Sequence, residues 1–212
     1  MNAAEFSNLE PFINRFKGKP LSNLHQSKIS CNIIHINSRP TFLKPFIYKP
    51  ILMKLKILVG TMTSTADYVA QAIQMDCADL ADDIEVRLMD GLDIGIFDQV
   101  DAKDALYIIC TSTYGMGDVP DNAHALYESL GAEPRFLGHV RYGVIALGDS
   151  ISHSPTFCFG GKKFDERLQD LGARRLGEIC CLDAGVEPQP EMQAVAWCRN
   201  WLTTALQPTG TP

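Results

Sequence analysis

The chain has 212 residues, of which 46% are hydrophobic and 21% are charged, and this composition suits a globular protein with one sizeable core. Its net charge is −6, but the first 53 residues carry seven basic and two acidic residues, which leaves 12 basic and 23 acidic residues after Met53. The remainder therefore has a formal charge of −11, which excludes nucleic acid as the expected partner because phosphate backbones require a cationic surface.

Seven cysteines occur at scattered positions, and no C-x-x-C pair is present, so we expect no zinc site or other metal site. Cys110 and Cys180 lie inside apolar runs, where cysteine usually acts as a small buried hydrophobe. No run approaches the ~20 apolar residues of a membrane span, and no secretory signal begins the chain. These features favour a cytoplasmic protein with reduced thiols and no membrane partner.

Residues 1–53 show no helical or strand periodicity, and five prolines interrupt them. The segment is basic and almost free of acids, as organellar transit peptides are. Met53 begins "MKLKILVG", which resembles a natural protein start that continues into a strand. We therefore expect residues 1–53 to be a disordered extension or the result of a mis-assigned start, with a targeting segment as the alternative, and residues 54–207 to form the domain.

Apolar strand patterns and helical patterns alternate from Lys54 onward. Strands are predicted at Lys54–Gly60, Ile84–Asp90, Asp104–Ser112, Arg141–Gly148 and Ala173–Asp183. Helices are predicted at Ala66–Ala81, Asp121–Leu130, Gly160–Gly172 and Pro190–Leu206, the last with an apolar face that includes Met192, Val195 and Leu202. The second strand alternates like an exposed edge strand, and the third is apolar on both faces like a central strand.

Five strands alternating with helices predict an open, parallel, doubly wound α/β sheet. Ligands in such sheets bind at the carboxyl ends of the strands, near the point where the strand order reverses. The loops after the first, third and fourth strands are therefore the candidates for a binding site.

The first of these loops, "GTMTSTADY", contains four hydroxyl residues directly before a helix. Hydroxyl groups and free backbone N–H groups at a helix N-terminus can bind phosphate without a cation. The loop matches neither the G-K-[ST] nor the G-x-G-x-x-G phosphate motif. The alternative is an ordinary helix cap rich in Ser and Thr.

The second loop, "TSTYGMGDVPDN", is not a dinucleotide loop, because Pro120 occupies the place of the third glycine. Tyr114 offers a ring for stacking, and Gly115 and Gly117 let the backbone approach a flat ligand. The alternative is a plain turn with an exposed tyrosine.

The third loop, Gly148–Gly161, is longer than the two to six residues usual at this position, and this length is typical of functional loops. A nucleophilic serine is not expected, because no G-x-S-x-G elbow is present. One phosphate loop and two loops around a flat ring together favour flavin mononucleotide (FMN) over a sugar or a metal.

Together the three motifs resemble the flavodoxin-like FMN-binding proteins, most of all the MioC-type short flavodoxins and the FMN domains of diflavin reductases. The resemblance covers about Leu55 to Leu206. It implies a three-layer sandwich around a five-stranded parallel sheet of strand order 2-1-3-4-5, with one non-covalent FMN.

The resemblance also implies the residues that contact FMN. The phosphate maps to Thr61, Met62, Thr63, Ser64, Thr65 and Ala66. One side of the ring maps to Thr111, Ser112, Thr113, Tyr114, Gly115, Met116 and Gly117. The other side maps to Leu147, Gly148, Asp149, His153, Phe157, Cys158 and Gly161.

Two departures from the family pattern bear on this site. Ser64 and Thr65 stand where the family usually has glycine or asparagine, so weaker FMN binding is expected if a positive φ is needed there. Ser152 occupies the register of a frequent family tyrosine, and the neighbouring His153 is the candidate for the replacement ring.

By this resemblance the chain is an electron carrier without catalytic residues of its own, since the flavin supplies the redox chemistry. It would pass single electrons from an NADPH-dependent flavoprotein reductase to a redox metalloenzyme, docking as a monomer through its acidic surface. An FMN-dependent NAD(P)H oxidoreductase with its own substrate and a flavin-free doubly wound binding module are the alternatives.

Overall fold

The computed structural model describes residues 53–99, 104–186 and 189–205, and the described residues belong to one compact unit. The expectation for the basic segment before Met53 lies outside the described residues.

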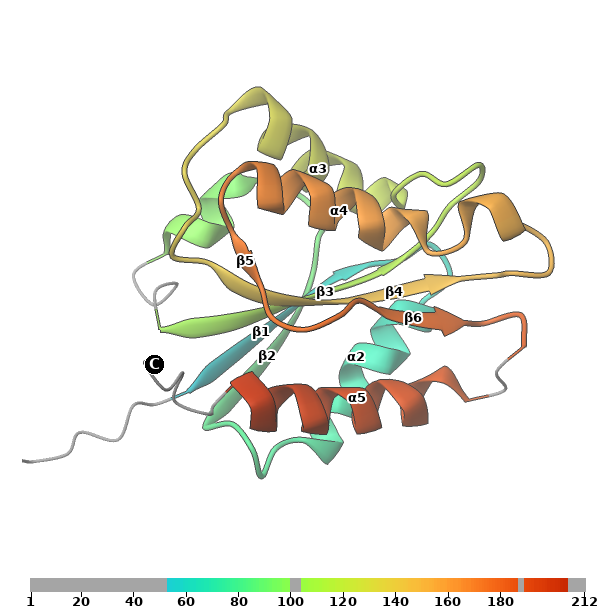
Figure 1. The fold of residues 1–212 in the computed structure, drawn as a ribbon, viewed down its shortest axis with the longest axis horizontal. Coiled ribbons are helices and arrows are strands. Elements are labelled where there is room, and N and C mark those ends of the chain that lie inside the picture. The colour runs from blue at the N-terminus through green and yellow to red at the C-terminus, as the bar shows by residue number, and fades with distance from the viewer. Residues whose placement is uncertain (1–52, 100–103, 187–188, 206–212) are drawn as a thin grey trace, which may run out of the picture. The chain divides into compact units, whose positions relative to one another are not determined.

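A parallel sheet forms the middle layer (Figure 1). Its strands are β1 (Lys54–Gly60), β2 (Asp83–Leu88), β3 (Ala105–Ser112), β4 (Arg141–Gly148), β5 (Arg174–Arg175) and β6 (Cys180–Asp183). The order is β2-β1-β3-β4-β5, and β6 also pairs with β4. The predicted order 2-1-3-4-5 is confirmed.

Burial explains the strand positions. From Leu55 to Gly60, β1 is wholly buried, and β3 is buried at all residues except Ser112, as central strands require. In contrast, β2 lies at the edge and is largely exposed, as its alternating sequence predicts. The predicted edge and centre of the sheet are therefore confirmed.

The prediction of one continuous last strand over Ala173–Asp183 is wrong, because the structure divides it into β5 and β6. Gly177 between them has φ +74°, a left-handed conformation that turns the chain out of the extended path. Arg175 Nε bonds the Gly177 carbonyl oxygen across this turn at 2.9 Å. Both pieces return to the same neighbour, β4, so the strand order is unaffected.

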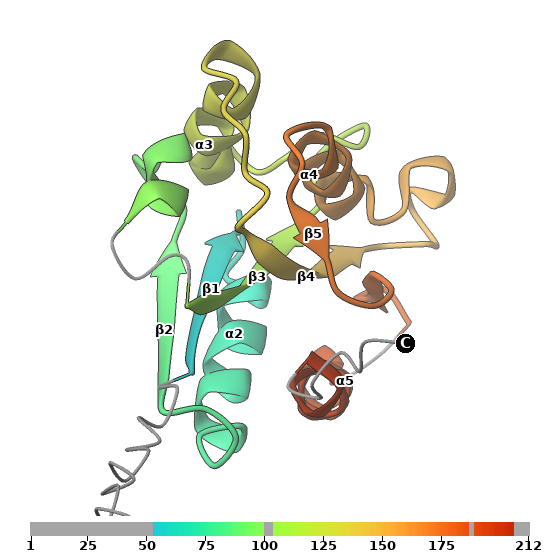
Figure 2. The same cartoon turned by 60° about the vertical axis from the view of Figure 1, so that its left-hand side comes forward.

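In the part of the chain that the structure describes, four α-helices cover the sheet: α2 (Thr65–Asp76), α3 (Asp121–Ala132), α4 (Phe159–Asp170) and α5 (Pro190–Ala205). α2 and α5 share one hydrophobic cluster on one face, and α3 and α4 share a second cluster on the other face (Figures 1 and 2). The doubly wound sheet predicted from the alternating pattern and the three-layer sandwich implied by the resemblance are confirmed.

The predicted apolar face of α5 is partly wrong. Met192 is 67% exposed, whereas Ala194, Cys198 and Trp201 are buried. The sequence of α5 offers two overlapping apolar faces, and the face that contains Trp201 packs against the sheet. The indole N–H of Trp201 donates to the Leu176 carbonyl oxygen at 2.6 Å.

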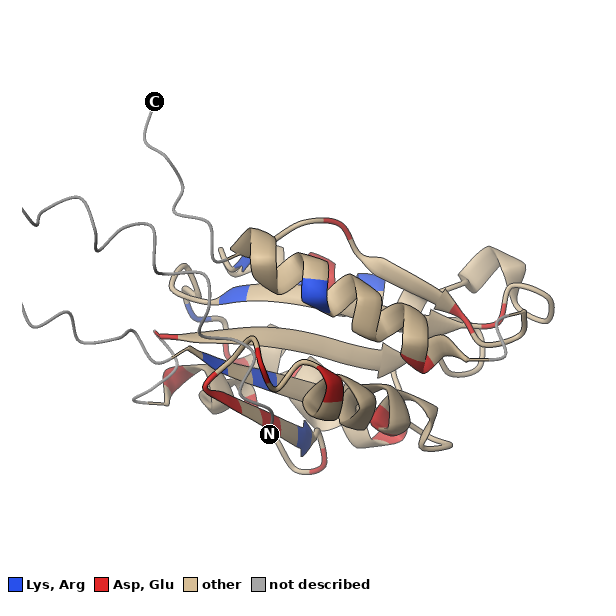
Figure 3. Cartoon of the chain, turned by 90° about the horizontal axis from the view of Figure 1, so that it is seen from below, with Lys and Arg blue, Asp and Glu red and all other residues tan. Residues whose placement is uncertain are grey.

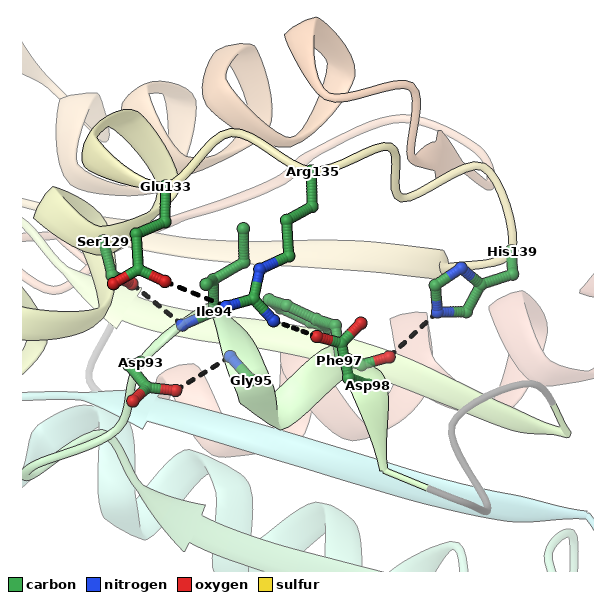
Figure 4. Close-up of polar contacts among 9 residues, drawn as sticks. All are labelled: Asp93, Ile94, Gly95, Phe97, Asp98, Ser129, Glu133, Arg135 and His139. Carbon is green, nitrogen blue, oxygen red and sulfur yellow. Dashed lines mark hydrogen bonds and ion pairs between the residues drawn. The ribbon is translucent and has the colours of Figure 1, made fainter.

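A short 3₁₀ helix, η1 (Ile94–Asp98), connects β2 to β3 and is fastened to α3 and the segment after it (Figure 4). The Ser129 hydroxyl accepts the Ile94 N–H at 2.9 Å, and His139 Nε2 lies 2.8 Å from the Phe97 carbonyl oxygen. The Arg135 guanidinium bridges the carboxylates of Asp98 and Glu133. These contacts fix the position of the connector against α3 and the residues that follow it.

Within the described ranges no helix is long and apolar enough to cross a membrane. The same part of the chain contains no group of three or more His, Cys, Asp or Glu side chains placed to hold a metal ion.

Candidate functional site

The loops that follow β1, β3, β4 and β6 meet at one edge of the sheet, on the right in Figure 1. They surround a cavity of about 170 Å³. This is smaller than the ~300–1,000 Å³ of a site that encloses a small molecule, so a larger ligand would remain partly in solvent. The lining residues are Thr63, Thr65, Ser112, Thr113, Gly115, Leu147, Gly148, Asp149, His153, Thr156 and Ala184.

Thr61 begins the loop after β1 and carries an unusual hydroxyl. Its Oγ1 atom is buried and has no hydrogen-bond partner among the described residues. Its backbone N–H donates to Asn122 Oδ1 at 2.9 Å, and Asn122 Nδ2 donates to the Val59 carbonyl oxygen at 3.3 Å. Asn122 thus fixes the backbone of the loop, and the buried Thr61 hydroxyl stays without a partner among the described residues.

Ser64 precedes α2 in a left-handed conformation, φ +63°, and its side chain makes no capping bond. This conformation costs a residue other than glycine ~1–2 kcal/mol. It places the uncapped first turn of α2 at the end of a loop without Lys or Arg. Uncapped N–H groups and hydroxyls are suited to an anion held without a cation.

The loop after β3 folds back on itself. Tyr114 and Asp118 exchange backbone hydrogen bonds of 2.8 Å in both directions, with positive φ at Gly115 and Gly117. The Tyr114 side chain is half exposed beside the cavity, and Gly115 lines it with open space where a Cβ would lie. The backbone at Gly115 can therefore lie against a flat group.

Thr113 joins this loop to the other side of the cavity. Its N–H and its hydroxyl both donate to the Leu147 carbonyl oxygen at 3.0 Å, and its Oγ1 accepts the Gly160 N–H at 3.1 Å. The loops after β3 and β4 are consequently held at a fixed spacing.

Asp149 organises the loop after β4. Its Oδ1 accepts the N–H groups of Ile151 and Ser152, each at 2.9 Å, and the Ser152 N–H is the main reason that the pKa of Asp149 lies below its ordinary value. His153 follows and is exposed at the cavity. Asp183, the last residue of β6, accepts the Ser150 N–H at 3.2 Å and so ties the end of β6 to this loop.

The structure brings many of the predicted site residues together. Those that line the cavity are Thr63, Thr65, Ser112, Thr113, Gly115, Leu147, Gly148, Asp149 and His153. Met62, Tyr114 and Met116 are exposed near it. Their roles toward a cofactor stay predictions.

The remaining predicted residues do not line the cavity; they are Thr61, Ser64, Ala66, Thr111, Gly117, Phe157, Cys158 and Gly161. Ala66, Thr111, Cys158 and Gly161 are buried, and Phe157 is partly buried. A Cβ at Gly148 would come 2.8 Å from the Phe157 ring, and one at Gly161 would come 2.5 Å from Ala146 Cβ. These two glycines therefore allow close packing beneath the cavity.

Sequence reasoning missed Asn122, Thr156 and Ala184. Thr156 lies in the loop Gly148–Gly161, which the sequence predicts to be functional without singling out this residue. Ala184 follows the last strand, and that strand ends at the same edge of the sheet although its loop was not among the candidates. Nothing in the local sequence indicates that Asn122 bonds a loop 61 residues earlier.

Residues 57–197 match the family described as Flavodoxin. The chain belongs to the flavodoxin family. Proteins of this family bind FMN and carry electrons, so the cofactor is FMN and the chain is an electron carrier.

Three comparisons illustrate the relationship. The chain is 34% identical over 152 residues to flavodoxin YqcA of Escherichia coli strain K12, covering 72% of this chain and 98% of that protein. It is 41% identical over 152 residues to the sulfite reductase [NADPH] flavoprotein alpha-component of Vibrio cholerae serotype O1, covering 71% of this chain and 23% of that protein. A solved cysteine-to-alanine mutant of flavodoxin from Pseudomonas aeruginosa aligns with a TM-score of 0.60 and 31% identity over 72% of this chain and 98% of that one.

The geometry at this edge fits FMN. The unpartnered Thr61 hydroxyl and the uncapped start of α2 suit the phosphate of the cofactor. The open backbone at Gly115 suits a flat ring that stays partly in solvent. Bound FMN supplies the capacity to accept and release electrons, and the protein supplies binding, orientation and local charge.

Proposed function

We propose that this flavodoxin carries single electrons from an NADPH-dependent flavoprotein reductase to a redox metalloenzyme. The observation that carries the proposal is the charge around the cavity. The four loops contain no Lys or Arg. Two of them carry Asp118 and Asp149, and Asp183 ends β6 just before the fourth; we call these three residues the acidic rim. Figure 3 shows the distribution of acidic and basic residues along the cartoon.

The acidic rim keeps its charge in mildly acidic solution. The ion pair with Lys163 at 3.0 Å is the main cause that lowers the pKa of Asp118. The Ser150 side chain is the main cause for Asp183, and the Ser152 N–H for Asp149. A negative rim favours fast, transient docking on basic surfaces of redox partners.

Exposed apolar side chains border the same cavity. Met62 is 41% exposed, Met116 87% and Ile151 73%. An apolar patch inside a charged rim is typical of interaction surfaces. Electron transfer needs the flavin near the partner, and these side chains would be the first to touch it.

We further propose that the predicted residues hold FMN, with the phosphate at residues 61–66 and the ring between residues 111–117 and the loop after β4. Residues 54–207 would form the FMN-binding domain, and the family match over residues 57–197 supports that extent. The six cysteines of the described residues are free thiols, which supports a cytoplasmic, reducing location for a monomeric carrier.

The experiment is an anaerobic reduction of the FMN-loaded chain by NADPH, followed through the visible absorbance of bound flavin. We expect bleaching only when a catalytic amount of an NADPH-dependent flavoprotein reductase is present. Subsequent mixing with a ferric haem protein should return the oxidised spectrum as the haem is reduced.

Two results would decide against this proposal. Bleaching by NADPH alone would support an FMN-dependent oxidoreductase with its own substrate instead. A chain that reacts with the reductase but fails to reduce any of several ferric haem or iron–sulfur proteins would remove the metalloenzyme as acceptor.

A further inference from the structure

Two cysteines from distant parts of the sequence meet beside the cavity. Cys181 lies in β6 and pairs with Ala146 of β4, while Cys158 precedes α4. Cys158 Sγ lies 3.1 Å from the Ala146 carbonyl oxygen and 4.0 Å from the Leu182 carbonyl oxygen. It therefore contacts the backbone of the residue that pairs with Cys181 and of the residue that follows Cys181.

The pleat of β6 directs the two side chains to the same face of the sheet. Cys180 and Leu182 belong to the cluster under α2 and α5, so Cys181 points to the opposite face because successive side chains alternate. Cys158 belongs to the cluster under α3 and α4, on that opposite face. Both thiols therefore lie on the face of the sheet that α3 and α4 cover.

The two thiols differ in access. Cys158 is fully buried, whereas Cys181 is exposed. The Cys158 thiol has one hydrogen, for which the Ala146 carbonyl oxygen and Cys181 compete, and a Cys181 thiolate is the stronger acceptor because it is charged. The pKa of Cys181 is lowered chiefly by this bond and further by Lys162.

We propose that Cys181 and Cys158 form a dithiol–disulfide redox site that reacts with low-molecular-weight disulfides such as oxidised glutathione. The exposed thiol is the attacking group, and the buried thiol is the resolving group. This arrangement matches the general requirements of thiol–disulfide exchange, in which an accessible thiolate reacts first.

The reaction has two steps. The Cys181 thiolate attacks one sulfur of glutathione disulfide, which forms a mixed disulfide and releases one glutathione thiolate. Cys158 then loses its proton to water and attacks Cys181 Sγ, which forms the protein disulfide and releases the second glutathione thiolate. Two protein thiols are oxidised, and one small disulfide is reduced to two thiols.

A disulfide requires Cβ atoms about 3.5–4.5 Å apart. Cys181 faces the side of the sheet on which Cys158 Sγ contacts the Ala146 and Leu182 carbonyl oxygens, so the two side chains share that face. Ala184, which lines the cavity, follows Cys181 by three residues, and Phe157 directly precedes Cys158. Oxidation would join two of the loops that surround the candidate flavin site.

The test uses the full FMN-loaded chain, oxidised glutathione, rapid alkylation of remaining thiols and peptide mapping by mass spectrometry. We expect a Cys158–Cys181 disulfide that a dithiol reductant reverses. In Cys158→Ser the glutathione adduct on Cys181 should accumulate, and in Cys181→Ser neither product should form. Cys180→Ser is the matched control and should behave like the unmodified sequence.

We expect Cys181 to react at least about tenfold faster than Cys180, because Cys180 is more buried and its pKa is raised. Equal rates at these two cysteines, or an adduct on Cys181 that persists without a disulfide, would overturn the proposal. If Cys158→Ser does not fold, a time course of the unmodified sequence serves instead, because the adduct on Cys181 must precede the disulfide.

Discussion

The Thr61 hydroxyl is buried without a partner among the described residues, and we propose that a phosphate oxygen of FMN is its acceptor. We predict that Thr61→Val weakens FMN binding by roughly 10- to 100-fold, because a hydrogen bond to a charged group contributes ~1.5–3 kcal/mol. Titration of apo protein with FMN, followed by flavin fluorescence, measures the change.

Urea unfolding of the apo protein separates a loss of FMN affinity in Thr61→Val from a loss of folding. Valine has the shape of threonine, so urea unfolding of the apo form should show no loss of stability for Thr61→Val. Thr203→Val, on the exposed side of α5, should leave the FMN dissociation constant unchanged. An unchanged constant for Thr61→Val would remove Thr61 from the phosphate site.

Ser64 holds a left-handed backbone that glycine adopts without strain. We predict that Ser64→Gly raises the free energy of unfolding of the apo protein by up to ~1 kcal/mol, less than the full strain because glycine also gains freedom in the unfolded chain. Denaturant unfolding measures it. Ser64→Ala removes the hydroxyl but keeps the strain, so an equal gain for Ser64→Ala would contradict the explanation.

Cys181 should be reactive at an unusually low pH. Its pKa is lowered to about 6, chiefly by the Cys158 hydrogen bond and then by Lys162, against an opposing effect of burial. Since the thiolate is the nucleophile, its alkylation rate should rise as pH increases through about 6 and level off above it. Iodoacetamide labelling at several pH values measures this, and Lys162→Met should move the midpoint upward. A midpoint near the usual thiol range of ~8.5 would contradict it.

At the scale of single residues, the sequence indicated which loops carry the hydroxyl, glycine and acidic residues of the site. It did not indicate that the positive φ falls on Ser64 and not on Thr65, or that Asn122 holds the Thr61 backbone. Both depend on where α2 and α3 lie after the chain has folded.

At the scale of elements, a buried ionic contact joins β4, α4 and β5. Asp165 is 6% exposed; its carboxylate accepts the Tyr142 hydroxyl at 2.8 Å and pairs with Arg175. Burial, followed by the bond to Asp165, raises the pKa of Tyr142, so its hydroxyl remains a donor. This network holds the short β5 against the sheet edge.

We predict that Arg175→Leu lowers the free energy of unfolding by roughly 3 kcal/mol, because it leaves a buried carboxylate unpaired. Denaturant unfolding of Arg175→Leu, Asp165→Asn and the double variant forms a mutant cycle. The loss from Arg175→Leu should be much smaller when Asp165→Asn is already present. Equal losses in both backgrounds would show that the pair does not couple.

The order of strands and helices could be predicted from the sequence, because apolar residues recur at every second position in the edge strand β2 and at helical spacing in α2. The division of the last strand into β5 and β6 could not be predicted, because glycine is compatible both with an extended strand and with a turn, and Gly177 adopts the turn. Likewise, α5 carries two possible apolar stripes, and only its packing against β6 and α2 selects between them.

For the whole molecule, charge distribution around the cavity should control the rate of partner docking. We predict that Asp118→Asn slows electron transfer from the reductase by roughly two- to threefold at low salt, and that the difference disappears at high salt. Stopped-flow reduction at several ionic strengths measures this rate.

Asp79→Asn is the control for this prediction. It removes the same charge from a residue that pairs with Arg199 of α5, away from the four loops. If both variants slow the reaction equally, net charge and not the acidic rim governs docking.

The sequence by itself determined the alternation of strands and helices, the edge and central strands, and the family, because each depends on local periodicity and short motifs. Only the tertiary structure decided which residues line the cavity, that a fourth loop contributes Ala184, and that Cys158 meets Cys181. These contacts join segments far apart in the chain, and their distances follow from strand register and helix packing, which no local pattern encodes.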